Sequence, residues 1–430
     1  MLKNTNTFSE DEEDMEEEWP PFRKIGSFDP YTDDYRLAVK KVSFCGKSGR
    51  LIVGGTAGQV VNFELIVEGE PREETLTATP VTLVTEKDGF QWKGHTALAV
   101  KACDVKIPLG FQPSSILQLS PPASINSIGY CDEWKLMAAG TAHGLVVYDC
   151  LQNTTITAKC TLNAEDIANA DDNPMSRRKS LKKSLRESFR RLRKGRSQRN
   201  IDKKKSAPGD PIKKELPKYG RAESPIGDNR PVERAIEARN GSEDGQGSMV
   251  RCLHFAHTYI ANPQTISATL WAGTNTGQVL IFLLNIPNTE EKRKADKVSA
   301  MLAKEIQLKH KAPVLCVQVL DAGGVPIPEP NSYNSPDGDA ATTQPHRVLI
   351  ASEEQFKLFT LPTLKPSGKY KLTAHEGARV RRVGFVTFSQ KSNPEYTENC
   401  FTCLTNQGDL AIHSLPELRR QVLQVPNKIY

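Results

Sequence analysis

One pattern of apolar and polar positions recurs along the chain: an apolar strand, a tight turn that carries glycine, and a second apolar strand. The clearest copies lie at 51–61, 136–148 and 270–282, and weaker copies lie at 348–359 and 403–412. Short apolar runs on both sides of a glycine-containing turn indicate β-hairpins. We attribute the glycines to turns that require positive φ, which glycine adopts without steric cost. The pattern therefore predicts five hairpins.

A further apolar strand precedes each hairpin. These strands are predicted at 37–44, 125–131, 250–255, 314–320 and 380–388. His310 and His375 lie just before two of them, and His95 lies farther ahead of a third. A strand followed by a hairpin, with a histidine near the junction, is typical of the blades of a WD40-type β-propeller. Because the Trp-Asp dipeptide of such repeats is absent, we predict an all-β fold: a divergent WD40-type β-propeller of about five blades, in an incomplete ring.

The copies are separated by more than the ~40–45 residues of an ordinary propeller repeat. The excess falls in four polar inserts, at 68–88, 165–247, 287–303 and 321–345. We divide the chain into an acidic, disordered lead-in, two blades, a long inter-blade loop and three further blades, with bounds at 1–18, 19–164, 165–248 and 249–430. The loop is rich in Lys, Arg, Pro, Ser and Gly and poor in aliphatic residues, so we expect it to be disordered apart from one basic amphipathic helix.

That helix is predicted from a motif within 177–199 that recurs every four residues. The motif is a serine followed by a large apolar residue and then a basic residue. The apolar residues recur at i, i+4, i+8 and i+11, which is one stripe of an α-helix; they are Leu181, Leu185, Phe189 and Leu192. A serine precedes each of the first three, at Ser180, Ser184 and Ser188.

The charge of the chain is concentrated in the same segment. Between 177 and 199 there are 12 basic residues and one acid, Glu187, which gives 12 − 1 = +11, whereas the whole chain carries only +6. Acidic lipid attracts such a segment by roughly 1 kcal/mol per Lys or Arg, while its apolar stripe inserts at the headgroup boundary. Each phosphoserine would add about −1.5 to −2 charges. The pattern therefore predicts a membrane-binding helix that phosphorylation releases.

We assign lipid binding to the basic side chains of this helix and insertion to its four apolar residues. The basic residues are Arg177, Arg178, Lys179, Lys182, Lys183, Arg186, Arg190, Arg191, Arg193 and Lys194. Most Lys/Arg runs are instead solvated tails, nuclear-import signals or nucleic-acid patches. The four-residue repeat, the apolar stripe and the placement of the serines favour the membrane, so no nucleic-acid partner is expected.

This segment resembles the kinase-responsive segment of the lethal giant larvae family of cell-polarity proteins. Other stretches that look like the family are 16–31, 92–95, 270–275, 352–357 and 377–383, and the resemblance runs from about 16 to about 422. It implies that the chain holds most of the second of two propellers and is a fragment or a short product. It also implies a phosphoprotein in which atypical protein kinase C phosphorylates Ser180, Ser184 and Ser188.

The resemblance further implies a non-catalytic scaffold and names its partners. These are atypical protein kinase C and its Par-complex adaptor, acidic phospholipids including phosphoinositides, scaffolds of the Scribble and Discs-large type, non-muscle myosin II, and syntaxin-type SNAREs. The expected location is cytoplasmic, at the cell cortex and the basolateral plasma membrane as a peripheral protein. Links to the cytoskeleton, exocytosis and tumour suppression are expected as well. The alternative is a SNARE-binding regulator of vesicle exocytosis, related to double-propeller secretion proteins.

Enzymatic, cofactor and metal chemistry is not indicated. Cys400 and Cys403 form a CxxC pair inside an expected strand without a second pair of ligands, and His254 and His257 are isolated from other ligands. The chain has no phosphate-binding glycine loop after a strand and no nucleophile-elbow motif. It has no apolar run of 18 residues and no apolar leader, and its nine cysteines lack framework spacing, which fits a reducing cytoplasm.

Overall fold

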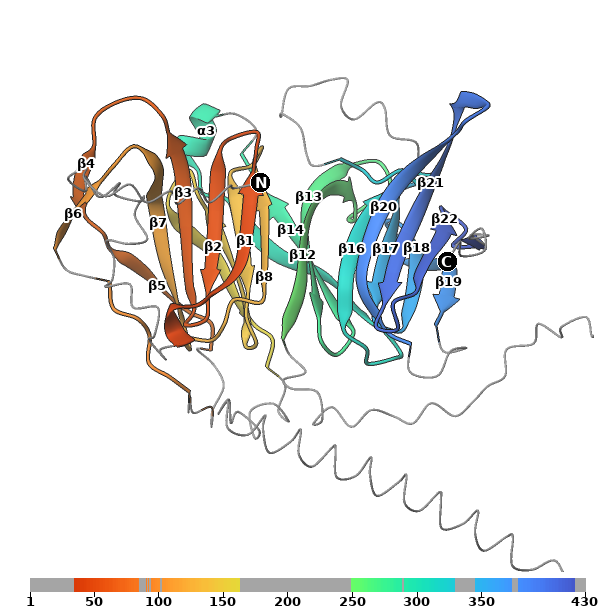
Figure 1. The fold of residues 1–430 in the computed structure, drawn as a ribbon, viewed down its shortest axis with the longest axis horizontal. Coiled ribbons are helices and arrows are strands. Elements are labelled where there is room, and N and C mark those ends of the chain that lie inside the picture. The colour runs from red at the N-terminus through yellow and green to blue at the C-terminus, as the bar shows by residue number, and fades with distance from the viewer. Residues whose placement is uncertain are drawn as a thin grey trace, which may run out of the picture. The chain divides into compact units, whose positions relative to one another are not determined.

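A computed structural model describes the chain at residues 35–84, 90, 92, 94–100, 103–162, 249–287, 290–328, 345–372 and 378–421. The acidic lead-in, the basic segment 177–199 and almost all of the inter-blade loop lie outside these residues. The regular structure of the described chain is almost entirely β-strand, arranged in five consecutive sheets and one two-stranded ribbon (Figure 1).

The first sheet follows a 3-10 turn, η2 (Tyr35–Leu37), and has five strands. Their order is β1 (Val39–Cys45), β2 (Arg50–Gly55), β3 (Gln59–Ile66), β7 (Gly110–Ser120) and β5 (Ala78–Thr82). Only β5 runs parallel to its neighbour. A separate two-stranded ribbon joins β4 (Arg72–Thr75) to β6 (Asp104–Ile107).

Each of the other four sheets is an antiparallel meander of four strands. The second contains β8 (Ser127–Cys131), β9 (Leu136–Gly140), β10 (Gly144–Asp149) and β11 (Thr154–Cys160); the third contains β12 (Val250–Tyr259), β13 (Ile266–Thr274), β14 (Gln278–Asn285) and β15 (Ser299–Gln307). The fourth contains β16 (Val314–Leu320), β17 (Arg347–Ser352), β18 (Gln355–Thr360) and β19 (Lys365–Lys371); the fifth contains β20 (Val380–Gln390), β21 (Asn393–Thr405), β22 (Leu410–Ser414) and β23 (Arg420–Gln421).

The sheets are joined to one another in the same way along the chain. The hairpin turn between the second and third strands of one sheet hydrogen-bonds to the start of the first strand of the next. The N–H of Val250 donates to the carbonyl O of Thr141 at 2.9 Å, and the N–H of Val380 donates to the carbonyl O of Glu353 at 2.8 Å. We call the end of the sheets that carries these turns the turn end. It lies at 55–58, 141–144, 274–277, 352–355 and 405–408 in the five sheets.

The glycines beside these turns have two different roles. Gly58, Gly277 and Gly408 have φ of 77°, 76° and 87°, as the sequence predicts for turn glycines. In the second sheet the predicted hairpin is present, but the positive φ predicted for its glycine is wrong, because Gly140 is not among the residues with positive φ. A Cβ on Gly140 would lie 2.6 Å from Val250 Cγ1. This glycine is needed because the next sheet packs directly against it.

The same contact recurs at neighbouring junctions. A Cβ on Gly54 would lie 2.6 Å from Ile125 Cγ2, and one on Gly273 would lie 2.6 Å from Val314 Cγ1. Each glycine thus faces a β-branched residue that opens the following sheet. The repeat of one packing contact at successive junctions is a tertiary feature that periodicity in the sequence does not reveal.

Hydrophobic clusters fill the spaces between neighbouring sheets. One cluster joins the first and second sheets, a second the second and third, a third the third and fourth, and a fourth the fourth and fifth. Trp271 in β13 is fully buried in the third of these clusters. Among the described residues no cluster joins the fifth sheet to the first. The predicted fold is confirmed: it is all-β, with five propeller blades in an open series.

Two of the polar inserts contain more regular structure than the sequence predicts. The insert at 68–88 contains β4 and β5, and the insert at 287–303 contains the helix α3 (Glu290–Ala295) and the first half of β15. Their strands are half-exposed, so alternation with polar residues hid them from a search for apolar runs. No helix in the described part of the chain is long and apolar enough to cross a membrane.

Candidate functional site

The predicted phosphorylation and membrane-binding residues all lie in 177–199, outside the described residues. The structure does describe the two places where the inserted segment 163–248 meets the propeller. These are the end of the second sheet, at Leu162, and the start of the third sheet, at Met249. The structure therefore describes the candidate site at these two stems.

Both stems are bonded to one turn, Thr141–Gly144, which connects β9 to β10. The N–H of Thr161 donates to the carbonyl O of His143 at 3.0 Å, and the N–H of Val250 donates to the carbonyl O of Thr141 at 2.9 Å. The second stem is also tied to the third sheet, because Asn275 N–H donates to the carbonyl O of Met249 at 2.9 Å. The long insert consequently leaves and re-enters the fold at one fixed point of the turn end.

The turn itself is held by side-chain hydrogen bonds. Thr141 Oγ1 accepts from the N–H of His143 at 3.0 Å and donates to the carbonyl O of Gly144 at 3.3 Å. Gly144 has no room for a side chain, because a Cβ there would collide with the carbonyl O of Lys159. Thr141, His143 and Gly144 are all buried, so these polar contacts are shielded from water and strengthened by the low local dielectric.

Aromatic residues from the segment between β5 and β6 cover this turn. The ring of His143 lies 5.5 Å from the rings of both Phe90 and Trp92, edge to face in each case. Trp92 is fixed in turn, because its Nε1–H donates to the carbonyl O of His95 at 2.7 Å. Trp92 and His95, which belong to a stretch that the sequence relates to a known family, therefore support the turn to which both stems of the insert are bonded.

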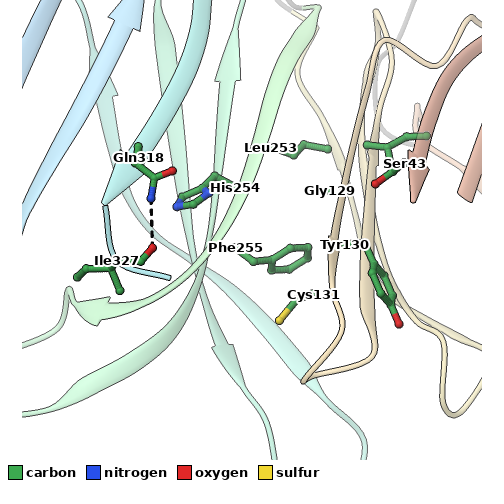
Figure 2. A pocket seen from close by; sticks show the side chains of 10 residues that line it. Ser43, Gly129, Tyr130, Cys131, Leu253, His254, Phe255, Gln318 and Ile327 are labelled. Atoms are coloured by element: carbon green, nitrogen blue, oxygen red, sulfur yellow. Dashed lines mark hydrogen bonds between the residues drawn. The ribbon is translucent and has the colours of Figure 1, made fainter. Parts of the chain in front are cut away.

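The first strands of four sheets border a pocket of about 300 Å³ (Figure 2). Ser43, Gly129, Leu253, His254 and Gln318 contribute to its wall, from β1, β8, β12 and β16. Burial lowers the pKa of His254 to about 4, so this imidazole is neutral at pH 7. The Gln318 amide donates to the carbonyl O of Ile327 at 3.3 Å rather than into the pocket. The lining residues include Ser43, Tyr130 and the neutral His254 but no Asp, Glu, Lys or Arg, so the pocket offers a ligand no charged partner.

The cysteines and histidines singled out in the sequence do not converge on a metal. In the described chain no group of three or more His, Cys, Asp or Glu is placed to hold a metal ion. Cys400 and Cys403 are both buried in β21, and all nine cysteines are free thiols. Burial raises the pKa of Cys403 to about 11, so its thiol is protonated and a weak ligand at neutral pH.

Comparison with known proteins finds relatives that cover nearly the whole of this chain. No protein-family model matches the chain. The chain is 43% identical over 415 residues to "Lethal(2) giant larvae protein homolog 1" of Rattus norvegicus, which covers 95% of this chain and 39% of the relative. It is 43% identical over 466 residues to "Lethal(2) giant larvae protein" of Drosophila pseudoobscura pseudoobscura, with 95% and 38% covered. The resemblance to the lethal giant larvae family is confirmed.

A third relative carries a more specific name. "LLGL scribble cell polarity complex component 2" of Danio rerio is 45% identical over 413 residues, with 95% of this chain and 39% of the relative covered. The chain thus spans about two fifths of the length of the lethal giant larvae relatives it matches. Among solved structures, the WD40 domain of SCAP from fission yeast matches 90% of this chain and 52% of that chain, with 6% identity and a TM-score of 0.34.

Proposed function

We propose that this chain is a non-catalytic cell-polarity scaffold whose basic insert binds acidic membrane at the cell cortex and is released when its serines are phosphorylated. The lethal giant larvae relatives support the polarity role, and the name of the Danio rerio relative supports a Scribble-type partner. The observation that carries the membrane switch is the single turn that holds both stems of the insert. Both ends of the insert are held at this one turn of the propeller.

The chemistry of the switch follows from the charge of the insert. At +11 the segment 177–199 is attracted to anionic lipid, and three phosphates would cancel about half of that charge. Phosphate on Ser180, Ser184 and Ser188 would also place anionic groups beside the apolar residues that insert. Atypical protein kinase C with its Par-complex adaptor is the proposed kinase, acting on a cytoplasmic and basolateral pool of the protein.

The other partners in this proposal are scaffolds of the Scribble and Discs-large type, non-muscle myosin II and syntaxin-type SNAREs. They connect the cortex to the cytoskeleton and to polarised exocytosis, the setting of a tumour-suppressor role. In the alternative function, binding of SNAREs is the main activity and the membrane contact is incidental. The two functions differ in whether the serines control membrane binding.

The test is co-sedimentation of the intact chain with acidic and with neutral vesicles, before and after treatment with atypical protein kinase C. We expect binding to acidic vesicles only, and at least about tenfold weaker binding after phosphorylation, because about half of the attracting charge is cancelled. A triple Ser180→Ala, Ser184→Ala, Ser188→Ala variant should remain bound after kinase treatment.

A Ser176→Ala, Ser197→Ala variant is the matched control, since these serines flank the repeat but are not followed by an apolar residue. It should be released by the kinase as the unmodified chain is. Binding that is absent, or that ignores phosphorylation, would overturn the membrane switch and shift the function to SNARE binding.

A further inference from the structure

Four lysines gather at the turn end, between the outer edges of the third and fourth sheets. Lys357 of β18 lies directly opposite Lys369 of β19, and two positions along the same face Gln355 lies opposite Lys371. Directly opposed residues of an antiparallel pair point to the same face. Lys309 follows β15, where the N–H of Leu308 donates to the carbonyl O of Gly277 at 2.9 Å. We call Lys309, Lys357, Lys369 and Lys371 the lysine cluster.

Burial, together with the positive charges of the lysine cluster, lowers the pKa values of Lys357 and Lys369. Burial lowers the pKa of Lys357, and the charges of Lys309 and Lys371 lower it further. Burial likewise lowers the pKa of Lys369, with Lys371 and Lys357 adding to the effect. Like charges held this close raise the free energy of the folded chain unless an anion neutralises them.

No acidic side chain pairs with the lysine cluster in the part of the chain that is described. None of its four ammonium groups takes part in an ion pair there. Glu354 lies near the cluster, and its negative charge partly offsets the lowering of the pKa of His310 by burial. Lys309, Lys369 and Lys371 are exposed and Lys357 is half-exposed. The cluster is therefore an open cationic surface without an acidic partner among the described residues.

This surface lies at the same end of the propeller as the two stems of the basic insert. The last strand of each sheet returns to the turn of its own sheet. Thr161 N–H donates to His143 O at 3.0 Å in the second sheet, and Leu372 N–H donates to Glu354 O at 3.0 Å in the fourth. Leu372 directly follows Lys371. A membrane that binds the insert and approaches the turn end would therefore also face the lysine cluster.

We propose that the lysine cluster is a second contact for acidic phospholipid headgroups, which lays the turn end of the propeller against the membrane that the basic insert binds. The inference rests on the proposed membrane function and adds an orientation to it. Lysine offers a compact, flexible point charge, which suits many headgroups rather than one shaped ligand. The cluster contains none of the predicted phosphorylation sites, so phosphorylation of the insert leaves this contact in place.

The test compares two double variants of the intact chain that change the net charge equally. Lys369→Glu with Lys371→Glu reverses the lysine cluster. Lys365→Glu with Lys391→Glu reverses two exposed lysines at the opposite end of the sheets, one of them in the same strand, β19. Co-sedimentation with vesicles of phosphatidylcholine and 30 mol% phosphatidylserine measures the apparent affinity of each.

We expect the lysine-cluster variant to bind at least about tenfold more weakly than the unmodified chain, and the control to change by less than about threefold, because exposed charges beyond ~10 Å are screened at physiological salt. A Lys369→Gln, Lys371→Gln variant should lose affinity in the same direction but less. Equal binding of the two charge-reversed variants would overturn this inference while leaving the membrane switch intact. Absence of binding by the unmodified chain would overturn both.

Loss of an acidic protein partner by the lysine-cluster variant, with vesicle binding unchanged, would likewise contradict the inference. It would assign the surface to a protein instead. Thermal unfolding of both variants checks that they remain folded, and because the substituted lysines are exposed we expect melting temperatures close to that of the unmodified chain.

Discussion

At the end of the sheets opposite the turns, two ion pairs join charged side chains, whereas at the turn end the lysine cluster has no acidic partner in the described chain. Lys135 and Asp132 are 2.8 Å apart at the opposite end, and Arg293 of α3 reaches Asp149 at 3.1 Å. The Arg293–Asp149 pair is almost completely buried. Paired and buried charges hold loops of neighbouring sheets together, while unpaired exposed charges are available to a partner. Under our proposal, the lysine cluster is the part of the turn end that binds a partner.

The turn end also contains one acid, Glu353, that forms ion pairs, unlike the lysines of the cluster. Glu353 is buried and lies 3.6 Å from Arg381 and 4.0 Å from Arg251. These three residues come from the fourth, fifth and third sheets, so this ion-pair network spans two junctions. The turn end therefore keeps its structural charges together around one carboxylate, separate from the lysines.

Removal of Asp149 should have the largest effect on stability. Asp149 Oδ1 accepts from Arg293 at 3.1 Å and from the N–H of Leu151 at 2.9 Å, in a site closed to water. Asp149→Ala leaves a buried guanidinium without this carboxylate, and we expect a loss of about 3–5 kcal/mol in the free energy of unfolding. Chemical denaturation measures it.

Lys135→Met is the matched control at the same end, because it breaks a pair whose lysine is 38% exposed. Exposed pairs contribute about 0–1 kcal/mol. Equal effects of the two variants would contradict the distinction between structural and solvated charges.

The core between the two ends should respond to acid through His413. Burial lowers the pKa of His413 to about 4, and its ring lies 4.3 Å from Tyr370 and 5.4 Å from Phe356. The unfolded chain therefore binds a proton before the folded chain does. Stability from this group is full above pH 6.5, falls as the pH drops towards 4, and is lost below that, by up to about 3 kcal/mol.

His413→Gln should flatten this part of the stability profile, as followed by urea denaturation at a series of pH values. His254→Gln serves as a comparison, because the pKa of His254 is also lowered to about 4. A profile that keeps its full slope when both histidines are replaced would show that other groups control the response to acid.

The junctions at the turn end should not tolerate a larger residue at the packing contact that recurs between successive sheets. Gly273→Val places a Cβ 2.6 Å from Val314 Cγ1 and 2.7 Å from Cys252 Sγ. Overpacking of this kind costs about 1–3 kcal/mol. Gly46→Ala is the control, since the nearest atom to its Cβ is Phe44 Cε1 at 3.8 Å. Thermal unfolding should separate the two variants by several degrees.

The smallest effect is expected at the turn that holds the insert. Thr141→Val keeps the shape of the side chain but removes the hydroxyl that bonds to His143 N–H and to Gly144 O. An unsatisfied buried donor costs about 1–3 kcal/mol, and we expect a value near the lower limit because the carbonyl of Gly144 keeps its bond from Thr141 N–H. Faster cleavage near 161–163 by a nonspecific protease would report the loosened stem; unchanged cleavage would show that the hydroxyl is not needed.

The apolar strands and hairpins could be predicted from the sequence because each carries its own periodicity. The first strand of the third sheet begins at Val250 in both prediction and structure. The first strand of the fourth sheet runs over Val314–Leu320, as predicted. The helix α3 was missed, because it is six residues long and entirely polar apart from Ala295. The roles of Gly140 and Gly273 were missed because they depend on a residue in the next sheet.

The functional geometry was only partly accessible from the sequence. The predicted phosphorylation and lipid-binding residues stay predictions, since 177–199 lies outside the described residues. The turn at 141–144 was predicted as a hairpin, but its role as the anchor of both stems follows from two hydrogen bonds across the insert. The lysine cluster brings together residues from β18, β19 and the loop after β15, and only the strand register shows that they meet.

The most direct test of the claim that the turn end faces the membrane is hydrogen–deuterium exchange of the intact chain, free and bound to acidic vesicles. The account predicts slower exchange on binding for amides at 308–313 and 371–372, at the turn end, and no change at 132–135 and 361–364, at the opposite end. Protection at the opposite end, or equal protection at both ends, would contradict the account.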